Sequence, residues 1–147
     1  MIVGLLTFFH LTIASNVTVD RIPRTGSPPV RRLYASSVYL DGKIYYYGGR
    51  NHSGNSINDF HSFDINSEIW EKLEPVDEIK PLARITFAMY KSDSAIFVHG
   101  GHGPNGILND LWSYEVSLHV WKLSEQLGDV PPPFYRSGHT DFTFNGI

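Results

Sequence analysis

The sequence predicts an all-β protein built from copies of one four-stranded antiparallel unit. The first observation is a repeat, because a shift of 52 residues brings Pro29 onto Pro81 and Pro81 onto Pro133. The second is composition, since 9 Phe, 8 Tyr, 13 Gly and 9 Pro in 147 residues suit short strands joined by tight turns. The third is that no stretch shows a helical period. A period near 50 residues with recurring glycines and aromatic residues indicates one supersecondary unit stacked on its copies.

The repeat carries the same residue types in the same order in each copy. It runs through a proline, an arginine, a Gly-Gly pair, Asn-Asp, an aromatic residue and a tryptophan, and the shift becomes 51 after the glycines. The motif positions are Arg32, Gly48, Gly49, Asp59, Trp70, Arg84, Gly100, Gly101, Asp110, Trp121 and Arg136. Order and spacing agree together, which composition alone does not produce.

Each unit is predicted to form four short strands. In the first unit they cover residues 35–40, 43–47, 60–64 and 70–73, and Asp41-Gly42 predicts a two-residue hairpin between the first two. The second strand and its counterpart at 95–99 are apolar on both faces, so we expect both faces to be covered. We expect these two strands to end at their glycine pairs and a loop of about nine residues to follow. The counterparts of the last two strands are expected near 111–115 and 121–123.

The repeated order of residues resembles the kelch repeat of β-propellers, from residue 28 to residue 147. The resemblance implies kelch-type propeller blades, each a four-stranded antiparallel sheet. The chain would then hold about two blades, residues 28–79 and 80–130, and the start of a third at 131–147, so the propeller is incomplete. Ala35 and Phe87 depart from the third copy, which has His139 at this position. We expect a piece of a longer protein that self-associates through unpaired blade edges.

The motif residues have structural and functional interpretations. The glycines suit a close approach of backbones or a positive φ angle, whereas a phosphate-binding loop would need a helix start that is not predicted. Trp70 and Trp121 are expected to fill the contacts between blades rather than to stack on a ligand. The repeated arginines could bond to carbonyls or to Asp59 and Asp110, or face the central channel and bind an acidic partner. The kelch resemblance implies the structural alternative.

The N-terminal segment predicts a secretory signal peptide at residues 1–15. Residues 2–14 are almost all apolar, too few to span a bilayer, and small and polar residues follow them. No Lys or Arg precedes the apolar run, and His10 interrupts it, so a buried first strand in a cytoplasmic protein is the alternative. Residues 16–27 are then a linker or a first outer strand. Two sequons predict N-glycosylation at Asn16 and Asn51.

Several site chemistries are disfavoured. The net charge is -3 and the 12 Lys and Arg are spread along the chain, which argues against nucleic-acid binding. The absence of Cys excludes disulfides, thiolate metal sites and cysteine nucleophiles. His99 and His102 flank a flexible glycine pair and make a poor metal site. Ser137, His139 and Asp141 alternate along one strand, too far apart for a proton relay. We therefore expect no catalytic, cofactor or metal site.

The kelch resemblance implies a non-catalytic scaffold that binds an unknown protein partner through its loops. The segments that vary between the copies are residues 50–56, 75–80 and 103–106. The alternative is a propeller-fold enzyme, a hydrolase or a sugar-processing enzyme, whose site lies in blades outside this sequence. A copper-radical site of the galactose-oxidase type needs a Cys-modified Tyr, and this chain has no Cys.

Overall fold

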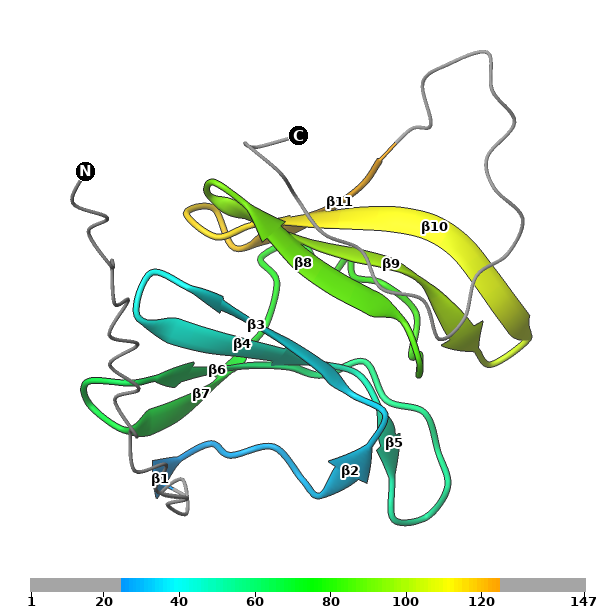
Figure 1. Ribbon diagram of the computed structural model, residues 1–147, viewed down its shortest axis with the longest axis horizontal. Coiled ribbons are helices and arrows are strands. Elements are labelled where there is room, and N and C mark those ends of the chain that lie inside the picture. The colour runs from blue at the N-terminus through cyan, green and yellow to red at the C-terminus, as the bar shows by residue number, and fades with distance from the viewer. Residues whose placement is uncertain (1–24, 125–147) are drawn as a thin grey trace, which may run out of the picture.

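The computed structural model describes residues 25–124, which contain strands and no helix. The strands form two main sheets and one small ribbon (Figure 1). In the first sheet the order is β1 (Thr25–Gly26), β7 (Ile69–Leu73), β6 (Phe60–Asp64), β4 (Lys43–Tyr47), β3 (Ser36–Leu40). In the second it is β11 (Val120–Leu123), β10 (Gly106–Glu115), β9 (Ala95–Gly103), β8 (Ala88–Ser92). The ribbon pairs β2 (Arg32–Leu33) with β5 (Arg50–Asn51).

Two four-stranded antiparallel meanders correspond to the two predicted units. We call β3, β4, β6 and β7 blade 1, and β8 to β11 blade 2. Within each blade, consecutive strands pair with one another, and neither sheet closes on itself. The predicted fold class, an incomplete set of propeller blades, is confirmed.

The turn between the first two strands of blade 1 follows from its sequence. Asp41 has a φ angle of 49° and Gly42 a φ angle of 79°, the pair of positive values that a two-residue hairpin of type I′ requires. Next, the turn between β6 and β7 is closed by the Asp64 carboxylate, which accepts the backbone N–H groups of Asn66 and Ser67 at 3.0 and 2.9 Å. Local chemistry therefore sets both hairpins of this blade.

Blade 2 departs from the prediction at its glycine pair. The strand β9 runs through Gly100 and Gly101 to Gly103, and β10 begins at Gly106, so the expected strand end and nine-residue loop are wrong here. The ladder continues because His102 pairs with Ile107. Blade 1 has the equivalent bridge between Arg50 and Ser56, but its loop is one residue longer and the ladder stays fragmentary. The change of shift from 52 to 51 marks this deletion.

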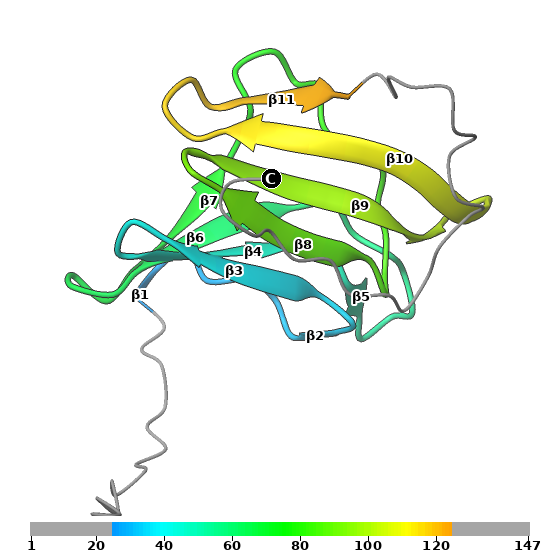
Figure 2. The same ribbon diagram turned by 45° about the horizontal axis from the view of Figure 1, so that its top comes forward.

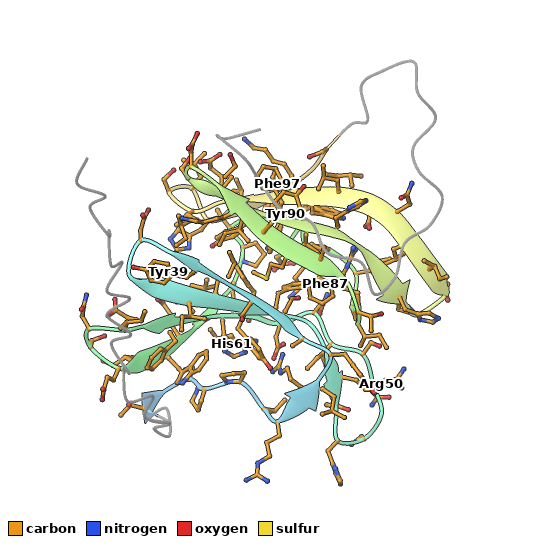
Figure 3. The ribbon with its side chains drawn as sticks, viewed as in Figure 1. Tyr39, Arg50, His61, Phe87, Tyr90 and Phe97 are labelled. Carbon is orange, nitrogen blue, oxygen red and sulfur yellow. The ribbon has the colours of Figure 1, made fainter. Side chains whose placement is uncertain are left out.

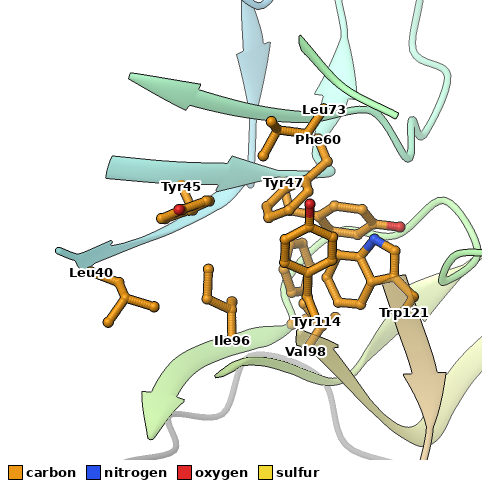
Figure 4. Close-up of a cluster of buried hydrophobic side chains, with 10 residues drawn as sticks. Leu40, Tyr45, Tyr47, Phe60, Leu73, Ile96, Val98, Tyr114 and Trp121 are labelled. Carbon is orange, nitrogen blue, oxygen red and sulfur yellow. The ribbon is translucent and has the colours of Figure 1, made fainter. Parts of the chain in front are cut away.

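The hydrophobic core lies between the two blades. The first strands of the blades, β3 and β8, run side by side (Figures 1 and 2). Aromatic rings from both sheets meet behind them, and the Phe60 ring centroid lies 4.8 Å from that of Tyr114 and 5.2 Å from that of Trp121 (Figure 4). The buried cluster consists of Leu40, Tyr45, Tyr47, Phe60, Leu73, Phe87, Ile96, Val98, Tyr114 and Trp121. Each blade therefore buries one apolar face only because the other blade is present.

The predicted segment boundaries are partly visible. Thr25 and Gly26 pair in parallel with Ile69 and Trp70 at the outer edge of blade 1. The predicted signal segment 1–15, the partial third repeat at 131–147, Asn16 and Arg136 lie outside the described residues.

Candidate interaction site

A buried arginine precedes the first strand of blade 2 and binds an aspartate on its third. The Arg84 side chain is 0% exposed, and its guanidinium donates to the two carboxylate oxygens of Asp110 at 2.7 and 2.8 Å. It also donates to the backbone carbonyls of Gly100 at 2.9 Å and Leu82 at 3.0 Å. A bidentate, charge-assisted pair is among the stronger hydrogen-bonded contacts. It ties the connection between the blades to β9 and β10.

The equivalent arginine of blade 1 makes the same contacts. Arg32 donates to both carboxylate oxygens of Asp59 and, at 3.0 Å each, to the carbonyls of Gly48 and Val30. The partners are those expected from the repeat, but each belongs to the same blade as its arginine. Since the contacts are internal, this geometry supports the structural interpretation of the repeated arginine.

The residue two positions after each aspartate adds a further partner. In blade 2 the Trp112 indole N–H donates to Asp110 at 2.7 Å. In blade 1 this position holds His61, which is buried beneath the N-terminal segment. Its Nε2 lies 3.1 Å from the Asp59 carboxylate and its Nδ1 lies 3.0 Å from the Ser27 carbonyl. His61 thus connects the segment that follows β1 to β6 (Figure 3).

These contacts keep both aspartates ionised. Burial by itself would raise the pKa of Asp59, but hydrogen bonds from His61 and Arg32 outweigh burial and lower it well below its usual value of 3.8. Burial would also raise the pKa of Asp110, but the contacts from Arg84 and Trp112 outweigh burial. The pKa of Asp110 is therefore lowered as well. Both carboxylates are occupied by structural partners and have little capacity for proton transfer at neutral pH.

The second glycine of each pair has the same surroundings in both blades. Gly49 has a φ angle of 96° and Gly101 one of 92°. A Cβ on Gly49 would lie 2.8 Å from the Leu33 carbonyl oxygen, and one on Gly101 would lie 2.7 Å from that of Ile85. A side chain at either position would meet backbone, so the glycine is required by close approach as well as by φ.

The first glycine lies at the boundary between blades. A Cβ on Gly48 would lie 2.9 Å from the Phe87 ring of blade 2. Beside it, the Gly49 N–H donates to the Arg84 carbonyl of blade 2 at 2.9 Å. The Gly-Gly pair of blade 1 therefore carries a backbone contact between the two blades.

The two motif tryptophans have different environments. Trp121 is 2% exposed and packs on Tyr47 of blade 1, with ring centroids 5.5 Å apart, as expected for a residue between blades. Trp70 lies on the face of blade 1 that points away from blade 2. It is partly exposed and contacts the rings of Phe63 and Tyr46 from its own blade, at 5.0 and 6.4 Å.

A groove of about 460 Å³ borders the β2–β5 ribbon. It is lined by Arg31, Arg32, Leu33, Arg50, Asn51, His52 and Gly54. Arg31 and Arg50 are exposed and form no ion pair within residues 25–124, and the groove has no carboxylate in its lining. Arg50 projects from β5 at the edge of the molecule (Figure 3). The groove therefore presents positive charge that no described residue neutralises.

A second recess, along residues 74–80, differs in its charges. Glu74 accepts an ion pair from Lys72 and lies 3.8 Å from the Lys80 ammonium. The charge of Glu74 is thus balanced by two lysines, and only Glu78 of the lining forms no ion pair within residues 25–124, which makes this segment a weaker candidate for recognising a charged partner.

The sequence prediction singled out the loop at 50–56 but missed the role of Arg31. Arg31 and Arg50 lie 19 positions apart, and they come together because Leu33 pairs with Arg50 across the β2–β5 ribbon. The sequence indicates this groove only through a basic residue beside the repeated arginine and another directly after the glycine pair. Asn51 of the predicted sequon also lines the groove, and its side-chain oxygen accepts the Asn55 N–H at 3.0 Å.

Two kinds of feature are absent from the described residues. Residues 25–124 contain no group of three or more His, Cys, Asp or Glu placed to hold a metal ion. They also contain no helix with the length and apolar character of a membrane span.

The geometry defines a pair of β-propeller blades, each with an arginine–aspartate pair, a Gly-Gly approach and an aromatic core. Comparison with known families agrees, because the KLHDC2/KLHL20/DRC7 Kelch-repeats domain matches residues 5–146. The chain belongs to the kelch-repeat family.

Individual relatives are similar at a lower level. The leucine-zipper-like transcriptional regulator 1 homolog of Drosophila melanogaster is 27% identical over 74% of this chain and 12% of its own length. Kelch domain-containing protein 10 of Rattus norvegicus is 27% identical over 69% of this chain and 26% of its own. The N-(sulfonatooxy)prop-2-enimidothioate sulfolyase of Thlaspi arvense is 26% identical over 78% of this chain and 33% of its own length. The chain thus spans a third or less of the length of these relatives.

Proposed function

We propose that the chain is a non-catalytic interaction scaffold whose groove beside the β2–β5 ribbon binds an acidic segment of a partner protein. The observation that carries the proposal is the exposed charge of Arg31 and Arg50, which no carboxylate within residues 25–124 pairs, in a groove without carboxylates in its lining. Such a field attracts acidic segments and disfavours basic ones.

The surroundings of the groove suit a peptide that is also partly apolar. Leu33 lines the groove and is 65% exposed, and Val30 and Tyr34, which are close to it in the sequence, are each 57% exposed. Exposed apolar side chains beside unpaired charge are typical of protein-binding surfaces. The wall of the groove is also held in place, because Arg32 in it donates hydrogen bonds to Asp59 and to the Gly48 carbonyl. A rigid wall reduces the entropy lost on binding.

Fluorescence polarisation with a labelled peptide of alternating Glu and Leu tests this proposal. We expect Arg31→Glu with Arg50→Glu to weaken binding at least tenfold, and binding to fall as salt is raised, because exposed charges are screened. The two substitutions are also made singly, and Lys122→Glu, at an exposed position of β11, is a control with the same charge change as each single variant. Equal affinity for wild type and the double variant, or equal affinity for a Lys-Leu peptide, would show that the groove is not the site.

A propeller-fold enzyme is the second candidate, and the sulfolyase relative is the observation that favours it. Incubating this chain with the compound in the name of that relative tests this candidate directly. Its consumption by this chain, followed by NMR, would overturn the non-catalytic proposal, and an unchanged spectrum would support it.

We also propose that the protein enters the secretory pathway. The support is the apolar run at residues 2–14 and the sequon at Asn51, a partly exposed residue at the end of β5.

A further inference from the structure

An exposed turn in the connection between the two blades carries two acidic and two apolar side chains. It consists of Val76, Asp77, Glu78 and Ile79, and all four are exposed. Val76 is 76% exposed, the highest value among the large hydrophobic residues that the structure describes, and Ile79 is 53% exposed. Neither Asp77 nor Glu78 forms an ion pair within residues 25–124. We call these four residues the acidic turn.

The acidic turn is held in place from both sides. Pro75 and Pro81, which flank it, are buried. The Val76 N–H also donates to the His119 carbonyl of blade 2 at 3.1 Å. Because its backbone is already fixed, the turn would lose little entropy on binding a partner. The recess along residues 74–80 is a weak site for a charged partner, but the turn at its rim can itself be a ligand.

The acidic turn matches the groove beside the β2–β5 ribbon in charge and in apolar character. The groove presents Arg31 and Arg50, which no carboxylate within residues 25–124 pairs, and Leu33, which is 65% exposed. The turn supplies two carboxylates for the arginines and two apolar side chains for the leucine. Because both surfaces are exposed, neither covers the other within one copy of the described residues.

We propose that the partner of the groove is a second copy of this chain, which inserts its acidic turn between Arg31 and Arg50. The inference rests on the proposed function of the groove and names its occupant. The contact is heterologous, because it uses different surfaces on the two copies. Each dimer therefore leaves one groove and one acidic turn free, so larger assemblies form as the concentration rises.

Complementation between two charge variants of the full chain tests the proposal. Arg31→Glu with Arg50→Glu reverses the charge of the groove. Asp77→Asn with Glu78→Lys removes the negative charge of the acidic turn, and Asn retains an acceptor for the Ile79 N–H, which the Asp77 carboxylate accepts at 3.2 Å. Sedimentation velocity at low salt should show that wild type associates and that each double variant is monomeric. A 1:1 mixture of the two variants should form a dimer, because each supplies the surface that the other lacks, and added salt should weaken this association.

Glu68→Lys with Glu71→Gln is the matched control, because it changes the net charge by as much as the variant of the acidic turn. Both glutamates are exposed, and Glu68 has a φ angle of 57°, close to the 58° of Glu78. Glu68 also lies beside the exposed Ile65 and Ile69 in a second turn with acidic and apolar residues. This control should associate like wild type. Circular dichroism must show the wild-type β spectrum for every variant, and Gln at the same charged positions replaces any substitution that alters it.

Four results would overturn the proposal: a monomeric wild type, association of either variant of the contact alone, a mixture that stays monomeric, or loss of association in the control. Binding of the Glu-Leu peptide separates this failure from a failure of the proposed function. The variant of the acidic turn keeps its groove, so it should bind the peptide at least as tightly as wild type. If the peptide binds and wild type is monomeric, only the self-association is wrong. If the peptide does not bind and wild type is monomeric, the proposed function of the groove is wrong as well.

Discussion

Arg84 has no access to water, and four hydrogen bonds to three groups hold its guanidinium and Nε. Burying a charge is costly unless a counter-ion and further hydrogen bonds compensate, and here Asp110 and two carbonyls do so. The same arrangement at Arg32 shows that it belongs to the repeat rather than to one site. At this scale the motif residues act as a frame that positions the strands.

Replacing Arg84 should lower the free energy of unfolding. Arg84→Met leaves Asp110 partly buried without its counter-ion, and we expect the free energy of unfolding to fall by roughly 3 kcal/mol. Urea denaturation measures the change. Lys122→Met, on the exposed side of β11, should change stability by less than about 0.5 kcal/mol. Adding Asp110→Asn to Arg84→Met should restore part of the loss, and equal midpoints for wild type and Arg84→Met would contradict the prediction.

The lowered pKa values of Asp59 and Asp110 predict sensitivity to acid. A carboxyl whose pKa is lower in the folded state than its usual 3.8 stabilises the fold fully above that value. The stabilisation is lost as the pH falls through the folded-state pKa, so the free energy of unfolding should decrease between about pH 5 and pH 2. Asp110→Asn should flatten this dependence, whereas Asp93→Asn, in the exposed β8–β9 turn, should retain it. Identical slopes in all three proteins would argue against the assigned cause.

At the scale of elements, both blades have the same close backbone packing at their glycine pairs. The strand β4 ends where Gly48 and Gly49 approach other backbone, and β9 continues past Gly100 and Gly101 because its loop is shorter. The close approach at the second glycine is nevertheless the same in both. This explains why the glycine pair recurs although the strand ends differ.

Gly49→Val and Gly101→Val should therefore destabilise the protein to a similar extent, each by more than about 1 kcal/mol. The added side chain would meet the carbonyl oxygen of Leu33 or Ile85, in addition to an unfavourable φ angle. Gly54→Val is the matched control, because Gly54 has a φ angle of 83° with nothing within 4 Å of an added Cβ. Thermal melting should separate the two effects. Loss at Gly54 as large as at Gly101 would mean that φ alone matters.

At the scale of the whole molecule, the two blades described in residues 25–124 share one hydrophobic core. Processing of the chain is the other property that concerns the molecule as a whole. Expression in a eukaryotic secretory host should yield a secreted protein whose N-terminus lies near residue 16, because the apolar run at 2–14 suits signal cleavage. N-terminal sequencing reads this directly, and intact Met1 on protein from the cytosol would refute it. Glycosidase treatment should lower the mass of the secreted protein. Asn51→Gln should make this decrease in mass smaller without changing the melting temperature.

The repeat, the four-stranded unit, the hairpin at Asp41-Gly42 and the shared motif of arginines, glycines and tryptophans could all be predicted from the sequence alone. These features follow from spacing and local chemistry, which are written along the chain. Three features follow only from the tertiary fold: Arg32 and Arg84 bond within their own blades, Trp121 is buried between the blades whereas Trp70 is partly exposed, and Arg31 meets Arg50. Each of these depends on which strands pair and which sheet covers which face. The repeat is nearly symmetric in sequence, but the environment is not, since within residues 25–124 each blade has a neighbour on one side alone.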